Sequence, residues 1–117
     1  MITRDPEQIE NTVDQVIGRK AYLPISKDAF REACPHPSLA ILVSAEDADE
    51  AVASLREAWE QAGNPSTSGL VVFIRGSFLT MDDLSRILAA TPRIERSRRG
   101  LDFSEPGHAK VEIYLFM

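Results

Sequence analysis

The chain has 117 residues and a formal net charge of -5, with 44% hydrophobic and 26% charged residues. These values are typical of a folded domain and exclude collagen-like and low-complexity sequences. No apolar run approaches the roughly 20 residues that a membrane-spanning helix requires, and the first ten residues show no signal-peptide pattern. A single cysteine excludes an internal disulfide framework. We therefore expect one cytoplasmic domain over residues 1–117, with no membrane association.

Two helices are predicted in the first third of the chain. Asp5 is a suitable N-cap and Pro6 fits the first helical position. Apolar residues then recur at helical spacing until Gly18, where the helix is expected to end. Ser26 is the expected cap of a short second helix, "KDAFREAC", over residues 27–34.

The central part of the chain predicts a buried strand followed by a helix. Residues 38–44, "SLAILVS", are almost continuously apolar, as expected of a strand that is buried on both faces. Ser44 and Asp47 have the spacing of a capping box and predict a helix over residues 45–62. Gly63 is the expected terminator of that helix.

A second strand and helix repeat this pattern. Residues 69–76, "GLVVFIRG", predict another central strand. Thr80 and Asp83 again have the spacing of a capping box. The helix that they begin is expected to place Met81 on its inner face and to end near Pro92.

Two further strands are predicted at the end of the chain, over residues 93–103 and 110–117, with a turn at Pro106-Gly107. The predicted order is therefore α-α-β-α-β-α-β-β. This order predicts a small α/β domain with a mixed four-stranded sheet. We expect the first two strands to be parallel, and the last two to form an α+β-like C-terminal hairpin.

The most basic segment is "RIERSRRG", residues 93–100. In a strand, Arg96 and Arg98 lie on one face and Arg99 on the other, so the arginines do not form one phosphate-binding stripe. The apolar face changes sides near Gly100, where we expect a β-bulge. The positive charges are expected to protect a sheet edge or to contact a partner protein.

The last strand has one aliphatic face and one mixed face. Tyr114 and Phe116 share the mixed face with Glu112. Either a helix of this chain or another chain must cover the two aromatic rings. Glu112 lies on the neighbouring strand, and Asp102 and Glu105 are close in sequence, so local neutralisation of the arginines of the preceding strand is expected.

Few residues are candidates for chemistry. Cys34 and His36 resemble a thiol–imidazole pair, but Cys34 lies on the apolar face of its predicted helix, which favours a packing role. His36 and His108 are the only histidines and have no recognisable zinc-ligand spacing. We predict no catalytic activity, no cofactor and no metal.

Two loops offer weaker signals. Residues 75–83 join a central strand to a helix, the place where open α/β sheets often bind ligands. They match no phosphate-binding motif, and Asp82 and Asp83 would repel a phosphate. The acidic run at residues 46–50 indicates a solvated helix start or an acidic docking surface.

The sequence favours a small protein-binding regulator or inhibitor, of the type of immunity proteins and antiactivators, that occupies a surface of its partner. A homodimer is also expected. The predicted contact residues are Arg96, Arg98, Arg99, Tyr114 and Phe116. Two alternatives remain open: a small-ligand domain or enzyme that uses residues 75–83, and a nucleic-acid module that uses Arg93–Arg99.

Overall fold

A computed structural model describes residues 1–77, 79–104 and 109–117. Over these residues the chain forms a small α+β domain with four helices and a mixed five-stranded sheet. The helices are α1 (Pro6–Val16), α2 (Lys27–Ala33), α3 (Ala48–Gln61) and α4 (Met81–Ala89). The strands are β1 (Ile2–Thr3), β2 (Ala40–Ala45), β3 (Gly69–Gly76), β4 (Arg96–Asp102) and β5 (Val111–Phe116). The prediction of four strands was wrong, because β1 has only two residues and carries no strand pattern of its own.

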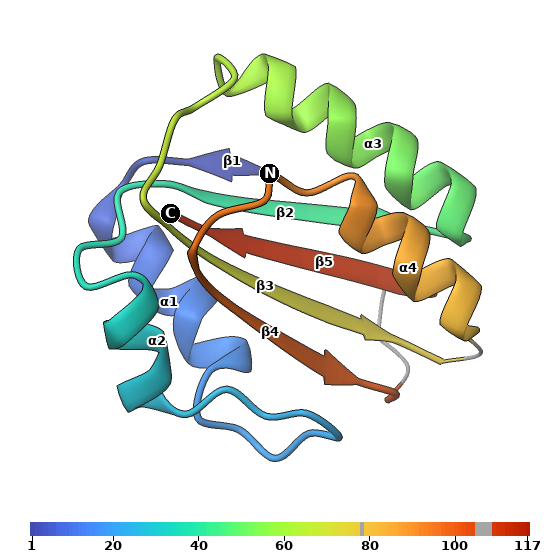
Figure 1. Ribbon diagram of the computed structural model, residues 1–117, viewed down its shortest axis with the longest axis horizontal. Helices are drawn as coiled ribbons and strands as arrows, with labels where there is room; N and C mark the ends of the chain where they lie inside the picture. The colour runs from blue at the N-terminus through green and yellow to red at the C-terminus, as the bar shows by residue number, and fades with distance from the viewer. Residues whose placement is uncertain (78, 105–108) are drawn as a thin grey trace.

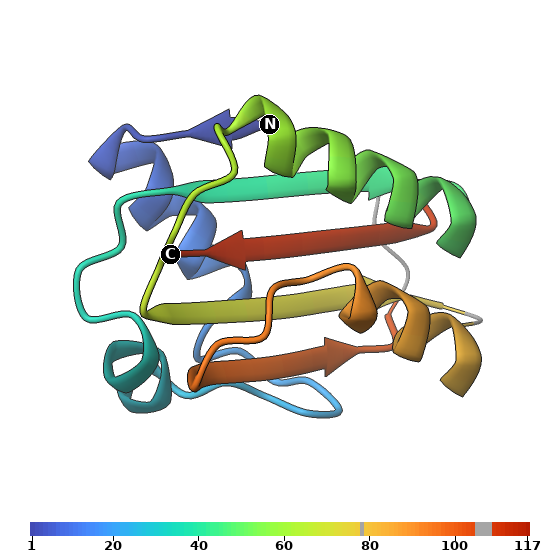
Figure 2. The same cartoon turned by 45° about the horizontal axis from the view of Figure 1, so that its top comes forward.

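The strands are arranged in the order β1-β2-β5-β3-β4, as Figure 2 shows. β5 lies antiparallel to both β2 and β3, and β4 is parallel to β3. The first two predicted strands, β2 and β3, do run in the same direction, but β5 separates them. The predicted C-terminal hairpin was wrong, because β5 enters the centre of the sheet instead of pairing with β4. The predicted turn at Pro106-Gly107 lies outside the described residues.

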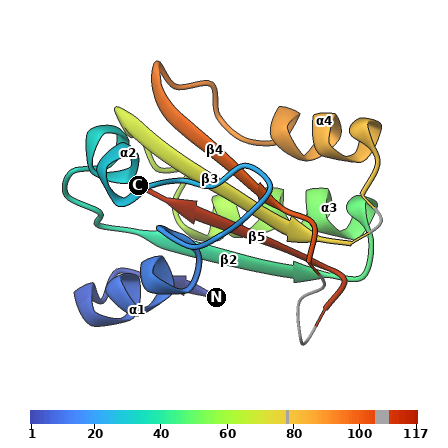
Figure 3. The same cartoon turned by 90° about the horizontal axis from the view of Figure 1, so that it is seen from below.

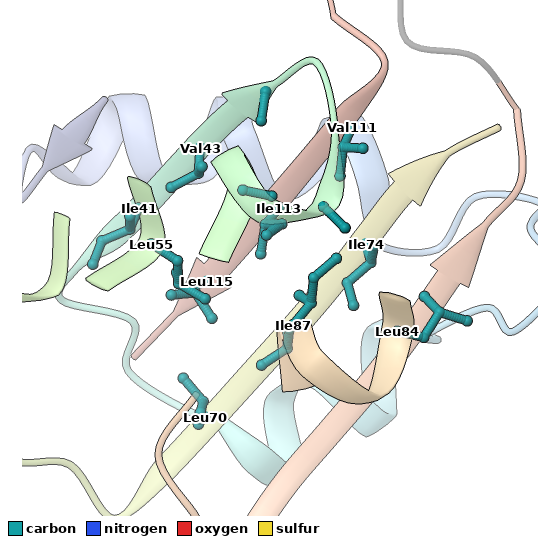
Figure 4. Packing of buried hydrophobic residues seen from close by; sticks show 14 of the residues in the cluster. Ile41, Val43, Leu55, Leu70, Ile74, Leu84, Ile87, Val111, Ile113 and Leu115 are labelled. Carbon is teal, nitrogen blue, oxygen red and sulfur yellow. The ribbon is translucent and has the colours of Figure 1, made fainter. Parts of the chain in front are cut away.

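Helices cover both faces of the sheet. α3 and α4 lie on one face, and α1 and α2 lie on the other (Figures 1 and 3). The first face buries the aliphatic side chains of β2, β3 and β5 against the two helices, as Figure 4 shows for Leu55 of α3 and Ile87 of α4. The second face buries Phe73, Tyr114 and Phe116 under α1 and α2. The central strands are therefore apolar on both sides.

The local signals for helix starts were largely correct. Asp5 accepts a hydrogen bond from the Glu7 N–H at 3.0 Å, and Ser26 accepts one from the Ala29 N–H at 3.1 Å. Both are the predicted N-caps. The capping box of Thr80 and Asp83 is also present. Each of these caps satisfies backbone donors that the first helical turn leaves without a partner.

Two local predictions about the helices on the first face were wrong. Asp47, not Ser44, caps α3, and it accepts the Glu50 N–H at 2.8 Å. Ser44 continues β2, where it pairs with Glu112. Met81 does not face the core: it is 78% exposed, since it occupies the first position of α4 on the solvent side.

Candidate functional site

The most distinctive surface is the outer edge of β4, the last strand of the sheet (Figure 2). Leu101 exchanges two main-chain hydrogen bonds of 2.9 Å with Leu23, which lies in the connector between α1 and α2. Hydrogen-bonding direction alternates along a strand, so the N–H and C=O groups of Ser97 and Arg99 point outward like those of Leu101. Among the described residues, Ser97 and Arg99 have no main-chain partner at this edge. The edge is thus closed at Leu101 and open at Ser97 and Arg99.

Arg96 and Arg98 lie on the α2 side of β4. The Nη2 atom of Arg98 is 3.3 Å from Oε2 of Glu32, and Nη2 of Arg96 donates to Oγ of Ser68 at 3.1 Å. The side chains of both members of the Arg98–Glu32 pair are at least half exposed, so water screens this ion pair and its contribution to stability is small. Both arginines remain available to a partner.

Arg99 lies on the opposite face of β4, beside α4. Together with Arg93 it lines a shallow groove of about 580 Å³, whose floor includes Leu88 and Ile94. Both arginines are exposed, and among the described residues neither lies within 4.0 Å of a carboxylate. This groove presents uncompensated positive charge beside apolar surface.

An apolar patch lies at the closed end of the same edge. Tyr22, Leu23 and Phe103 are 68%, 52% and 41% exposed, and the rings of Tyr22 and Phe103 lie 5.0 Å apart. Sequence reasoning missed Tyr22 and Leu23, because the sequence predicts no helix or strand over residues 21–26. The available signal was an aromatic and a leucine before Pro24, outside any helical or strand pattern that would bury them. Exposed aromatic residues next to arginines are typical of protein interfaces.

The structure separates the five predicted contact residues into two groups. Arg96, Arg98 and Arg99 are exposed at the β4 edge. Tyr114 and Phe116 are fully buried, since they lie in the central strand β5 beneath α1 and α2. The expected cover is therefore a helix of the same chain, and these two rings are not a contact surface of the described fold.

The expected bulge at Gly100 is absent. β3 and β4 keep continuous register from the pair Gly69–Arg96 to the pair Arg75–Asp102. The apolar pattern changes sides because Ile94 precedes β4 and packs from a loop. Gly100 instead permits close packing: a Cβ there would lie 2.5 Å from Cδ2 of Phe73.

Glu105, one of the three expected counterions of the β4 arginines, lies outside the described residues. The prediction that Glu112 and Asp102 neutralise these arginines was wrong. Both carboxylates face Arg75, whose Nη1 is 3.6 Å from Oε1 of Glu112 and whose Nε is 3.8 Å from Oδ2 of Asp102. The hydroxyl of Tyr114 donates to Oε1 of Glu112 at 3.4 Å. Burial raises the pKa of Tyr114, and the nearby charge of Glu112 raises it further. This cluster compensates one arginine at the sheet face beneath α1, which also supplies the Gln15 carbonyl.

Cys34 and His36 do not have the properties of a nucleophilic thiol–imidazole pair. Cys34 is buried, and this burial raises the pKa of its thiol although the charge of Arg96 acts in the opposite direction. A nucleophilic cysteine needs a lowered thiol pKa, so the raised pKa of Cys34 argues against this role. His36 is exposed. His108 lies outside the described residues. No group of three metal-binding side chains occurs within the described ranges.

The turn after β3 meets an acidic surface. Ser77 and Leu79 border a groove of about 470 Å³ together with the start of α3 and the first turn of α4. Arg86 forms ion pairs there with three carboxylates, which are those of Asp49, Asp82 and Asp83. The Thr80 hydrogen bonds and Arg86 lower the pKa of Asp83, so it is ionised at neutral pH. A phosphate would meet unfavourable charge in this groove.

Comparisons with known proteins indicate no function for this chain, so its surfaces are the basis for a functional proposal. No protein-family model matches the chain, and no curated protein matches its sequence. Within the part of the chain that the structure describes, no helix has the length and apolar character to cross a membrane.

Proposed function

We propose that this protein is a small binding protein that regulates or inhibits a partner protein by occupying one of its surfaces. The observation that carries the proposal is the β4 edge, defined here as the open main-chain groups of Ser97 and Arg99 with the flanking side chains of β4. It combines exposed arginines with the neighbouring Tyr22–Phe103 patch. Arginine and aromatic residues supply much of the binding energy of protein interfaces.

Other observations weigh against the two alternatives. The groove beside residues 75–83 is acidic, which disfavours the anionic substrates and cofactors that such loops usually hold. The arginines of β4 are divided between two faces, and the chain as a whole is acidic. A nucleic-acid site needs its positive charges along one surface. Immunity proteins and antiactivators are comparable types of protein. We place this protein in the cytoplasm, where thiols stay reduced, because its single cysteine is a buried free thiol.

The experiment that tests this proposal compares partner binding by two charge-reversal variants. The edge variant carries Arg96→Glu, Arg98→Glu and Arg99→Glu. The control variant carries Arg4→Glu, Arg19→Glu and Arg56→Glu, which change the net charge equally at exposed sites outside β4 and α2. Proteins cross-linked in cells to the wild-type chain are identified by mass spectrometry, purified and titrated by calorimetry.

We expect the edge variant to bind at least about tenfold more weakly than the wild type, because reversed charges repel the partner surface. The control variant should bind with unchanged affinity. Equal binding by both variants contradicts the proposal, as does the failure of every purified candidate to bind directly. Tight, salt-dependent binding of DNA or RNA that Arg98→Glu abolishes would instead support the nucleic-acid alternative.

The predicted homodimer has lost the observation that motivated it, because Tyr114 and Phe116 are covered within the chain. Self-association stays a prediction, and light scattering across a concentration series measures it. A constant monomer mass at high concentration contradicts it.

A further inference from the structure

We propose that the partner contributes an acidic, extended segment that pairs with the β4 edge as an additional strand. This inference rests on the proposed function and specifies the chemistry of the partner. Main-chain hydrogen bonds at Ser97 and Arg99 would provide the pairing, and the β4 arginines would select carboxylate side chains. Strand addition of this kind is a recurring mode of peptide recognition.

The β4 edge already accepts an extended segment of this chain. Leu23 forms an antiparallel bridge with Leu101, with both hydrogen bonds at 2.9 Å. The connector then leaves the edge, because Ile25 turns into the core, where it is only 2% exposed. The carbonyl of Ile25 accepts the Gly18 N–H at 2.8 Å and is therefore used within the connector. The chain's own segment thus stops one hydrogen-bonding position short of Arg99.

The open part of the β4 edge is long enough and accessible enough for a short strand. Arg96, Arg98 and Arg99 are exposed, and Ser97 is partly exposed between them. Four residue steps from Arg96 to Gly100 span about 13 Å at the usual rise of a strand. Among the described residues, the only side-chain contact with an outward main-chain group here is a long one of 3.4 Å, from Arg98 Nη1 to the Ser97 carbonyl. A short incoming strand fits this length and leaves the Leu23 bridge in place.

The positive charges at the β4 edge favour an acidic segment. Side chains of an added strand would alternate between the α4 face and the α2 face of the sheet. On the α4 face they would meet Arg99 and the groove that Arg93 lines. On the α2 face they would meet Arg98, whose present partner is the exposed Glu32. Because neighbouring residues of a strand point to opposite faces, carboxylates at neighbouring positions are complementary to the arginines on both faces. Opposite charges on facing strands are stabilising.

A second copy of this chain fits the same edge poorly. A two-fold antiparallel pairing of β4 with β4 would bring arginines of one copy opposite arginines of the other. Like charges directly opposite each other destabilise strand pairs. The arginines thus oppose edge-to-edge self-pairing and favour an acidic strand, and these two effects come from the same charges.

The test uses a substitution that removes one outward N–H. The N–H of Ser97 points away from β3, so Ser97→Pro should preserve the sheet while it removes a donor at the open edge. Ser97→Ala is the matched control. The probes are peptides selected from a displayed library of random extended sequences, together with the purified partner from the charge-reversal experiment.

We expect the selected peptides to be enriched in Asp and Glu at neighbouring positions, whose side chains point to opposite faces of the sheet. Ser97→Pro should weaken the binding of both probes about tenfold, whereas Ser97→Ala leaves it unchanged. Hydrogen exchange should slow at the amides of Ser97 and Arg99 in the complex. Peptides selected on the Arg99→Glu variant should not be enriched in Asp and Glu. If Ser97→Pro does not fold, N-methylated versions of the selected peptides replace it, because they lack the peptide's own donors.

The outcomes separate this inference from the proposed function. A partner that loses affinity for the edge variant, yet binds Ser97→Pro normally and leaves both amides unprotected, overturns the added strand and leaves the proposed function standing. A partner that binds the edge variant like the wild type overturns both. Peptides without an acidic excess overturn the choice of an acidic segment.

Discussion

β4 and β5 follow each other along the chain and belong to one sheet, yet one strand is largely exposed and the other is buried. All six residues of β5 are buried, whereas β4 exposes Arg96, Arg98 and Arg99 and buries only Gly100 and Leu101. β5 pairs with a strand on each side, and β4 pairs along its length with β3 alone. The two strands show how a mixed sheet assigns its positions.

The physical reason lies in what each strand can bury. β5 has apolar or hydrogen-bonded side chains on both faces, so helices can cover it on both sides. β4 carries guanidinium groups, which are costly to remove from water without partners. Its place at the edge therefore keeps these charges hydrated and also leaves its outer main-chain groups accessible. β4, which carries exposed arginines, is therefore the candidate binding surface.

The largest expected effect concerns aromatic residues on either side of this contrast. Phe116→Ala should destabilise the fold by about 3–5 kcal/mol, because it leaves a cavity beneath α2, where Phe30 packs against the ring. Phe103→Ala, at the exposed patch, should cost less than about 1 kcal/mol. Urea denaturation of both variants measures the difference. Equal losses of stability would mean that Phe103 belongs to the core.

A smaller effect is expected within β4 itself. Gly100→Ala would place a methyl group 2.5 Å from Phe73 and 2.9 Å from Ile25, and should cost about 1–3 kcal/mol through overpacking. Ser97→Ala in the same strand should change the free energy of unfolding by less than about 0.5 kcal/mol. Thermal unfolding of the two variants tests whether only the inner end of β4 is tightly packed. A tolerated Gly100→Ala would contradict this division.

The smallest effect should appear only at alkaline pH. Burial raises the pKa of Tyr114 above its usual 10.0, so the folded state favours the neutral phenol. Stability from this group is complete below pH 10.0 and is lost as pH rises through the folded-state pKa. In a Cys34→Ala background, which removes the thiol titration, Tyr114→Phe should flatten the fall in melting temperature above pH 10.0. Parallel curves for the two proteins would show that Tyr114 ionises freely.

The helices were predictable because their signals are local. The caps at Asp5, Ser26 and Thr80 act within three residues along the chain. The prediction that Ser44 caps a helix failed because the competing contact is not local. Ser44 belongs to β2 and pairs there with Glu112 of a distant strand. A capping pattern alone does not reveal that competition.

The candidate site was only partly predictable. Alternation along a strand correctly divided Arg96 and Arg98 from Arg99. The same alternation placed Tyr114 and Phe116 on one face, but it does not reveal whether a helix covers that face. The Tyr22–Phe103 patch joins residues that are far apart in the sequence, so no local pattern indicates it.

The sequence by itself determined where the helices form, which segments are the longer strands and which side chains share a face of a strand. These properties depend on capping residues and on hydrophobic spacing, which act over a few positions. Only the tertiary structure decided the order of the strands, the cover over Tyr114 and Phe116, and the open edge at Ser97 and Arg99. These properties depend on which distant segments compete for the two sides of each strand, and that competition is settled by burial and charge across the whole sheet.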